Sequence, residues 1–290
     1  MIKAYTLSKS YGAVQALREV SLNVARGELF GLIGPDGAGK STLIRILSTL
    51  LLPDTGEAVV NGSDVVRDFR KLRRHIGYMP GMFALYPDLS IEENLHFFAA
   101  LFGTAVEENY DLVRDIYSQI EPFKDRPAGK LSGGMKQKLA LSCALIHKPE
   151  VLFLDEPSTG VDPTSRRELW DMLARLRSEG ITIVVSTPYM DEAVRCDRIA
   201  LMREGEILVT DTPQNLIAAY SQTLYAVRSS DTYATLRALR ALPQVKSCFA
   251  FGESLHLTLH DATDLPLIQQ AVSADYREIA PSIEDYYMNI

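Results

Sequence analysis

Cysteine is scarce in this chain of 290 residues. The three cysteines, Cys143, Cys196 and Cys248, lie far apart, and none of them forms a C-x-x-C pair. The sequence therefore indicates neither a disulfide framework nor a zinc site, and we expect a reducing, cytoplasmic setting.

Long apolar runs are also absent. No run reaches the roughly 18 residues that a membrane span requires. The longest candidate, residues 43–52, is interrupted by Arg45 and followed by Pro53. The N-terminal segment is too polar and too short for a signal peptide. We therefore expect any function at a membrane to depend on separate partner proteins.

Basic residues are fewer than acidic residues, 30 against 37. The formal net charge is -7, whereas nucleic-acid-binding surfaces are normally basic, so we predict no nucleic-acid partner. Apolar residues make up 47% of the chain and charged residues 23%. This composition is sufficient for a real core, and the length suits one large domain plus a small one.

Short apolar runs alternate with helical patterns, which predicts an α/β fold with a largely parallel sheet. The runs that read as buried strands are residues 29–33, 151–154, 181–186 and 199–202. Residues 90–146 are mostly helical in pattern, with one helix opening at residues 92–95 and another over 135–146. We interpret this segment as a helical insertion in the α/β core.

The last part of the chain has a different pattern. Strands are predicted over residues 222–229, 244–251 and 253–260, and helices over 231–242 and 263–274. A final helix is predicted to start at Ser282 as N-cap, with Asp285 three residues later. We therefore expect a core domain over residues 1–218 and a small α+β domain over 219–290.

A glycine-rich segment between a strand and a helix fits G-x-x-x-x-G-K-[ST]. It consists of Gly34, Pro35, Asp36, Gly37, Ala38, Gly39, Lys40 and Ser41, with Thr42 next to it. Glycines let backbone N–H groups turn around phosphate oxygens, and the helix N-terminus adds a positive dipole end. We expect Lys40 to reach the β- and γ-phosphates of ATP, and Ser41 to ligate Mg²⁺.

Two acids follow the predicted strand at 151–154. Asp155 is suited to holding Mg²⁺ through water, and Glu156 to polarising the attacking water as the catalytic residue. The alternative is a solvated acid pair at a strand end. The phosphate-binding motif upstream favours the nucleotide interpretation.

A third motif lies between these two. It consists of Leu131, Ser132, Gly133, Gly134 and Met135. Here the chain resembles the ABC ATPase family, whose signature reads LSGGQ. The resemblance implies a P-loop NTPase fold with a helical insertion and ATP hydrolysis coupled to transport. It also implies two subunits that enclose two ATP molecules, each signature binding the γ-phosphate of the opposite subunit's ATP.

Further segments match the family in order, and the resemblance covers residues 1–215. Tyr11 occupies the place of an aromatic residue that stacks on adenine, although it could also be an ordinary surface aromatic. Residues 158–162 resemble the loop that crosses the dimer interface. Residues 281–288 resemble the closing motif of ATPases that serve ABC-2-type exporters. Their helix could have a packing role or a regulatory or dimerising one.

Two positions depart from the family pattern. Gly81 stands where a glutamine is usual, and Pro188 stands where a histidine is usual. Neither residue has a side-chain hydrogen-bond donor, and proline also lacks the backbone N–H. Asp36 replaces the usual asparagine, a change that we regard as tolerated if its side chain points away from the phosphates.

These departures lead to a specific expectation. Loss of one preorganised transition-state donor commonly slows a reaction about 10²–10³-fold, so we expect ATP binding with weak hydrolysis at this chain's own site. The intact signature would serve a second ABC ATPase, in a heterodimer rather than a homodimer. The resemblance also implies membrane-spanning partner subunits. These would contact residues 82–90, unless those residues serve local packing.

Two alternatives to an exporter motor remain open. One is a regulatory ATP-binding module of a transporter. The other is a soluble ABC ATPase that acts on nucleic acid or ribosomes, which the acidic charge and the single ATPase unit disfavour.

Overall fold

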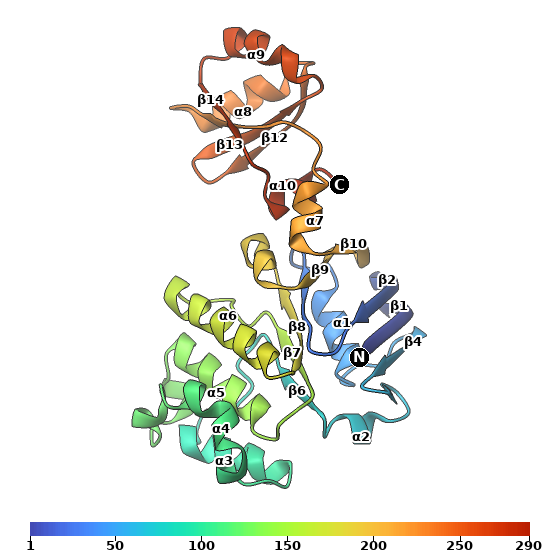
Figure 1. Cartoon of the computed structure of the whole chain (residues 1–290), viewed down its shortest axis with the longest axis vertical. Helices are drawn as coiled ribbons and strands as arrows, with labels where there is room; N and C mark the ends of the chain where they lie inside the picture. The colour runs from blue at the N-terminus through green and yellow to red at the C-terminus, as the bar shows by residue number, and fades with distance from the viewer. The chain divides into compact units, whose positions relative to one another are not determined.

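The computed structural model describes all 290 residues as two compact units, Met1–Thr212 and Pro213–Ile290. Each unit has a hydrophobic core of its own (Figure 1). The boundary expected after residue 218 falls at the end of helix α7 (Pro213–Ala218), which begins the second unit.

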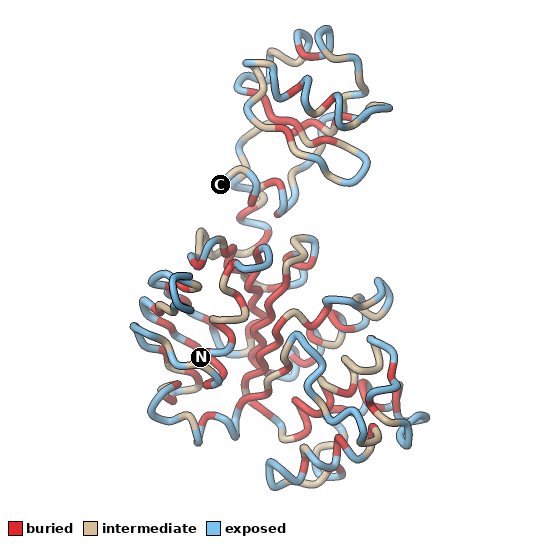
Figure 2. Tube along the Cα trace, turned by 180° about the vertical axis from the view of Figure 1, so that it is seen from behind, coloured by how far each residue is buried: buried red, intermediate tan, exposed pale blue.

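A six-stranded sheet forms the centre of the first unit. Its strands are β3 (Leu29–Ile33), β6 (Ile76–Met79), β7 (Val151–Asp155), β8 (Thr182–Thr187), β9 (Arg198–Arg203) and β10 (Glu206–Asp211). The order is β10-β9-β3-β8-β7-β6, parallel throughout except for β10. The prediction of a largely parallel sheet is confirmed. Strands β3, β7 and β8 are buried along their whole length, which fits their mainly apolar sequences (Figure 2).

Helices α1 (Lys40–Leu47) and α6 (Pro163–Ser178) pack on this sheet (Figure 1). The apolar side chains of α1 fit the helical period and are fully buried; they are Leu43, Ile44, Ile46 and Leu47. Helix α1 is only eight residues long. Ser48 and Thr49 end it, and Thr49 takes a left-handed conformation with φ of 66°.

A second, antiparallel sheet was not predicted from the sequence. It contains β1 (Ile2–Tyr11), β2 (Val14–Val24), β4 (Thr55–Val60) and β5 (Ser63–Asp64), in the order β2-β1-β4-β5. Register shifts interrupt β1 and β2, and Thr6 and Glu19 have positive φ angles. These irregularities break the simple alternation of apolar and polar residues by which such strands are predicted. A short helix, α2 (Phe69–Leu72), follows this sheet.

The helical segment contains α3 (Ile91–Leu101), α4 (Val106–Tyr117) and α5 (Gly133–Leu145). The one-turn helices η1 (Glu121–Phe123) and η2 (Ala128–Lys130) connect α4 to α5. A capping box between Ser90 and Glu93 starts α3. Helix α5 starts two residues before the predicted position because Ser132 caps it, and it packs on strand β6. None of the helices in the chain combines the length and the apolar character needed to cross a membrane.

The second unit has the element order β-α-β-β-α-β after α7. Its elements are β11 (Leu224–Arg228), α8 (Thr232–Arg240), β12 (Val245–Phe251), β13 (Ser254–Leu259), α9 (Leu265–Ala271), β14 (Asp275–Ile279) and α10 (Ile283–Met288). The antiparallel order β12-β13-β11-β14 is a ferredoxin-like arrangement. Strand β14 was not predicted, because its alternation is weak and its residues are half-buried or exposed.

Candidate functional site

The loop after β3 approaches other backbone segments too closely for side chains. A Cβ atom added to Gly34 would lie 2.3 Å from the carbonyl oxygen of Met202, and one added to Gly39 would lie 2.5 Å from that of Ala16. Gly39 also has φ of 101°, a conformation that L-residues rarely adopt. These contacts explain why the loop has glycine at both positions.

The loop leads into an open helix N-terminus. Gly39 is the N-cap of α1 and provides no side-chain hydrogen bond, and the first turn contains no acidic residue. Its backbone N–H groups are therefore available to an anion, and the helix dipole favours negative charge there. The exposed tip of the loop contains Asp36, where solvent can screen its charge from a phosphate.

Lys40 is held inside this loop. Its side chain is almost fully buried, and its Nζ donates to the carbonyl oxygens of Gly34 and Pro35 at 2.8 and 2.9 Å. The same Nζ lies 3.3 Å from Oε1 of Glu156. A buried ammonium with these weakly held partners is suited to contact phosphate oxygens.

Ser41 and Asp155 together provide a small oxygen site at the end of β7. The Ser41 hydroxyl donates to Oδ1 of Asp155 at 2.8 Å, and Ser186 donates to the same oxygen at 2.8 Å. The structure has no group of three or more acidic, histidine or cysteine side chains that could hold a metal. One carboxylate and one hydroxyl fit Mg²⁺, which usually takes its remaining ligands from water and substrate phosphates.

Glu156 has an unusual backbone conformation, with φ of 51°. Its N–H donates to the Ser186 hydroxyl at 2.9 Å, which fixes the turn at the end of β7. Non-glycine residues in this region are strained and are often found at functional sites. The carboxylate is partly exposed and lies next to Lys40, so it can reach both water and a phosphate.

Positions 81 and 188 both lie at this edge of the sheet. Gly81 follows β6, and a Cβ added to it would lie 3.0 Å from the carbonyl oxygen of Asp155. Pro188 follows β8, and the carbonyl oxygen of the preceding Thr187 accepts a hydrogen bond from Gly34 at 3.3 Å. The chain therefore has no donor side chain at either place.

Within the first unit, no histidine takes the place of the missing donor. His147 bonds the carbonyl oxygen of Ile76, at the opposite end of β6, and His75 immediately precedes that strand. His96 lies in α3, and His256 and His260 belong to the second unit.

The signature segment forms the start of α5. The Ser132 hydroxyl accepts a hydrogen bond from the Met135 amide at 3.3 Å, and Leu131 is buried. A Cβ added to Gly134 would lie 2.7 Å from Oγ of Ser165 in α6. The signature thus packs on the first turn of α6 while its N-terminal N–H groups stay near the surface.

Tyr11 ends strand β1, and its ring is 48% exposed. Val14, across the hairpin, is also exposed. An exposed ring next to an apolar side chain is available for stacking on a flat base.

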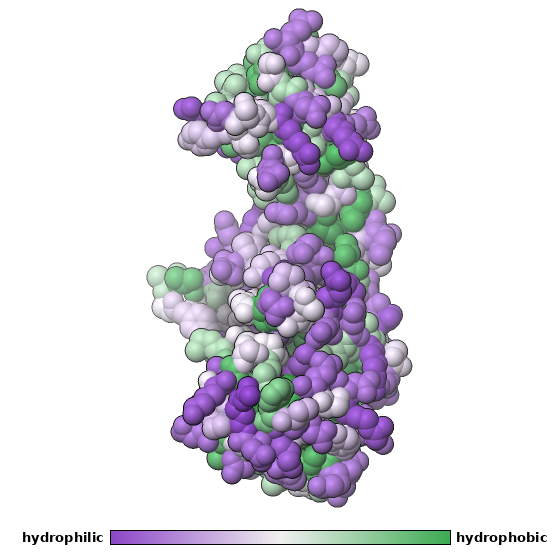
Figure 3. Space-filling model, turned by 90° about the vertical axis from the view of Figure 1, so that its left-hand side faces the viewer, coloured by the Kyte–Doolittle hydropathy of each residue, from purple (hydrophilic) through white to green (hydrophobic).

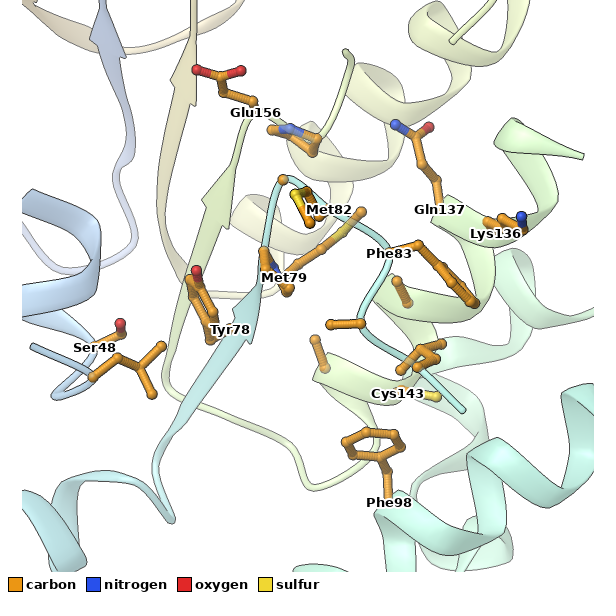
Figure 4. A pocket seen from close by; sticks show the side chains of 18 of the residues that line it. Ser48, Tyr78, Met79, Met82, Phe83, Phe98, Lys136, Gln137, Cys143 and Glu156 are labelled. Carbon is orange, nitrogen blue, oxygen red and sulfur yellow. The ribbon is translucent and has the colours of Figure 1, made fainter. Parts of the chain in front are cut away.

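A cavity of about 810 Å³ opens next to Gly81. Figure 4 shows Glu156 at one end and Phe98 and Cys143 towards the other, with Met79, Met82 and Phe83 between them. Burial raises the pKa of the Cys143 thiol and lowers that of the His147 imidazole, two groups in the lining. The face of the molecule in Figure 3 is mainly hydrophilic, with apolar residues in small groups. Residues 82–85, which belong to the segment 82–90 expected to contact a membrane partner, line this cavity, whereas the contribution of α5 was not predicted.

Three comparisons with known proteins agree on the family. The ABC transporter family profile matches residues 17–159. The probable multidrug ABC transporter ATP-binding protein YbhF of Escherichia coli is 41% identical over 284 residues, or 95% of this chain and 49% of YbhF. The chain thus spans about half the length of that relative. The Nod factor export ATP-binding protein I of a Rhizobium species is 33% identical over 98% of this chain and 94% of the relative.

A further relative and two solved structures extend the match. The linearmycin resistance ATP-binding protein LnrL of Bacillus subtilis is 30% identical over the whole chain and 98% of the relative. The dimeric ATP-binding cassette MJ0796 bound to ADP and Pi is similar with a TM-score of 0.67 and 27% identity, covering 73% of this chain and 98% of the cassette. An ATP-binding subunit of an ABC transporter gives a TM-score of 0.69 and 28% identity, covering 76% of this chain and 93% of that subunit.

The prediction of a P-loop ABC ATPase fold is therefore confirmed. With its phosphate-binding loop, its acid pair and its signature on one such fold, the chain belongs to the ATP-binding proteins of the ABC transporter family.

Proposed function

We propose that this chain is a subunit that binds Mg-ATP and powers export through separate membrane subunits, while hydrolysing ATP only weakly at its own site. The observation that carries the proposal is an asymmetry at the edge of the central sheet. Lys40, Ser41, Asp155 and Glu156 are assembled there, whereas Gly81 and Pro188 bring no donor side chain to it.

The intact side of the site is suited to hold nucleotide. The N–H groups of the loop from Gly34 to Thr42 would surround the phosphates, with Lys40 on the β- and γ-phosphates. Ser41 and Asp155 would take Mg²⁺, and Tyr11 would stack on adenine. Glu156 would act as the catalytic base towards the attacking water.

The other side lacks what fast hydrolysis requires. Phosphoryl transfer depends on positioning and on charge stabilisation, and each absent donor is expected to lower the rate about 10²–10³-fold. We infer that ATP at this site is mainly structural.

The signature supports a two-chain arrangement. Residues 131–135 remain complete and start α5 near the surface, so they can contact the ATP of a second ABC ATPase. The solved cassette MJ0796 is itself described as dimeric. We favour a heterodimer, because two copies of this chain would provide two weak sites. The YbhF protein is about twice as long as its match to this chain, which is enough for a second unit of similar size.

The cavity next to Gly81 is the surface that we assign to the membrane partner. It is lined mainly by apolar side chains, and Met82 at its mouth is 83% exposed. Exposed apolar groups of this kind often mark protein contacts. Relatives named for multidrug transport, Nod factor export and linearmycin resistance favour export, which would place the chain at the cytoplasmic face of the membrane.

The test compares steady-state ATP hydrolysis by the wild-type chain and by Gly81→Gln/Pro188→His. We expect the wild type to be near background and the double variant to gain activity that Glu156→Gln abolishes. The control is Gly81→Ala/Pro188→Ala, because any Cβ at position 81 must displace the Asp155 carbonyl group slightly. Brisk hydrolysis by the wild type, dependent on Glu156, would contradict the proposal.

A further inference from the structure

A buried carboxylate connects segments that surround the nucleotide edge of the first unit. Glu192 lies in the short helix η3 (Met190–Arg195) and is only 3% exposed. Its Oε2 accepts hydrogen bonds from the Ser158 hydroxyl at 2.9 Å and from the Thr187 hydroxyl at 2.5 Å. Both of these partners are fully buried, so the carboxylate bridges the chain after β7 and the end of β8 inside the protein.

Arg166 supplies the only cation close to this carboxylate. Its Nε lies 3.5 Å from Oε1 of Glu192, and its guanidinium group lies 4.1 Å from the ring centre of Tyr189. Neither Arg166 Nε nor Glu192 Oε1 has a hydrogen-bond partner. The Arg166 side chain is partly exposed, and an ion pair of this length with one exposed partner adds little to stability. This arrangement therefore favours a role in positioning over one in stability.

Glu192 connects one segment that follows the proposed catalytic residue Glu156 and another that contacts the phosphate-binding loop. Ser158 is two residues after Glu156. Thr187 precedes Pro188, and its carbonyl oxygen accepts from the Gly34 amide at 3.3 Å. Thr187 therefore links the carboxylate to the phosphate-binding loop.

The loop of residues 157–162 continues towards the signature. A Cβ added to Gly133 would lie 3.5 Å from the carbonyl oxygen of Gly160, and Gly134 lies directly against Ser165. Asp162 caps α6 by accepting from the amides of Thr164 and Ser165. A displacement of Ser158 would therefore reach the signature glycines through direct contacts.

We propose that Glu192 is a positioning residue that holds the loop 157–162 between Glu156 and the signature. Glu192 acts through its hydrogen bonds to Ser158 and Thr187. It is buried and does not belong to the phosphate-binding loop. Any effect of Glu192 on ATP that the signature contacts in a second subunit rests on the function proposed above. The hydrogen bonds of Thr187 and Ser158 to Glu192 give a side-chain connection between the end of β8 and this loop.

Two substitutions of Glu192 distinguish the effect of its charge from the effect of its hydrogen bonds. In Glu192→Gln the amide oxygen can still accept from both hydroxyls, but Arg166 loses its anion. Glu192→Ala removes both interactions. Glu179→Gln and Glu179→Ala are the controls, because Glu179 is a partly exposed carboxylate that pairs with Arg175 at the end of α6.

The first readout is amide hydrogen exchange of the full chain in Mg-ATP. We expect Glu192→Ala to speed exchange about tenfold or more in residues 156–162 and 132–137, as local opening does. Glu192→Gln should fall between Ala and the wild type, and α1 and both control variants should exchange like the wild type. Unchanged exchange in residues 156–162 would overturn the proposal, and so would a uniform increase that includes α1.

The second readout is the kinetics of ATP hydrolysis in the Gly81→Gln/Pro188→His background. Misplacement by about 1 Å can cost about 10²-fold in rate, so Glu192→Ala should lower kcat by about that factor. The KM for ATP should change little, and Glu192→Gln should restore part of kcat. An unchanged kcat would overturn the positioning role. If the background has no activity to lose, the degenerate-site proposal fails, and the exchange measurement still decides the role of Glu192.

Discussion

Two helix N-termini, one in each unit, are built in opposite ways. Helix α1 begins at Gly39 with no side-chain cap. Helix α10 begins at Ser282 with a capping box, in which Asp285 accepts from the Ser282 amide at 2.8 Å. Asp285 also pairs with His256 Nδ1 at 2.6 Å on strand β13. The difference is that the N-terminal N–H groups of α1 stay available to a ligand, whereas those of α10 are used within the fold.

The largest effect is expected at the open N-terminus. Lys40→Ala removes the buried ammonium group next to it, and we expect the affinity for Mg-ATP to fall by more than about 100-fold, or about 2.8 kcal/mol. Isothermal titration calorimetry measures this loss. Lys3→Ala, at an exposed lysine of β1, is the control. Binding that survives in Lys40→Ala would show that the open N-terminus is not the nucleotide site.

The closed N-terminus should respond in stability and not in binding. Asp285→Ala removes the cap and the hydrogen bond to His256, which is expected to cost about 2.5 kcal/mol of unfolding free energy for the second unit. Hydrogen exchange over β13 and α10 measures this cost, and the affinity for Mg-ATP should stay at the wild-type value. A large loss of ATP affinity in this variant would break the comparison.

Gly39 and Gly12 differ in how closely neighbouring atoms approach them, so substituting both tests the cost of a side chain at a crowded position. Gly39 and Gly12 both have positive φ, but a Cβ at Gly12 would meet nothing within 4 Å. We expect Gly39→Ala to be less stable than Gly12→Ala by about 2 kcal/mol, the usual range for overpacking. Chemical denaturation of both variants measures the difference. Equal stability would mean that the loop relaxes away from Ala16.

The smallest effect is expected at a third N-terminus, that of α5. Ser132 caps it through a long hydrogen bond of 3.3 Å to Met135, so this end is intermediate between open and closed. Ser132→Ala should cost about 1 kcal/mol or less, while lowering kcat in the Gly81→Gln/Pro188→His background. A stability loss well above that range would make Ser132 a structural cap, and unchanged kcat would remove it from the proposed signature role.

Features that depend on a local sequence pattern could be predicted before the structure was known. Strands β3, β7 and β8 each contain a short, mainly apolar run, and the N-cap at Ser282 is a local signal, so both could be found without a structure. The contact of Glu192 with Ser158 could not, since the two residues are 34 positions apart in the sequence and meet only when β7 and β8 pair in the sheet. Strands β1 and β2 were missed because bulges disturb their period, and the cavity because α5 and β6 are far apart in sequence.

The central claim, that this site binds ATP but hydrolyses it only weakly, is tested most directly by a single-turnover measurement. Radiolabelled Mg-ATP is mixed with excess purified chain, quenched with acid at intervals, and separated into ATP and ADP, with Glu156→Gln measured in parallel. Our account predicts that the bound nucleotide is converted to ADP only slowly in the wild type, at a rate little above that of Glu156→Gln. Rapid conversion to ADP in the wild type, but not in Glu156→Gln, would contradict it.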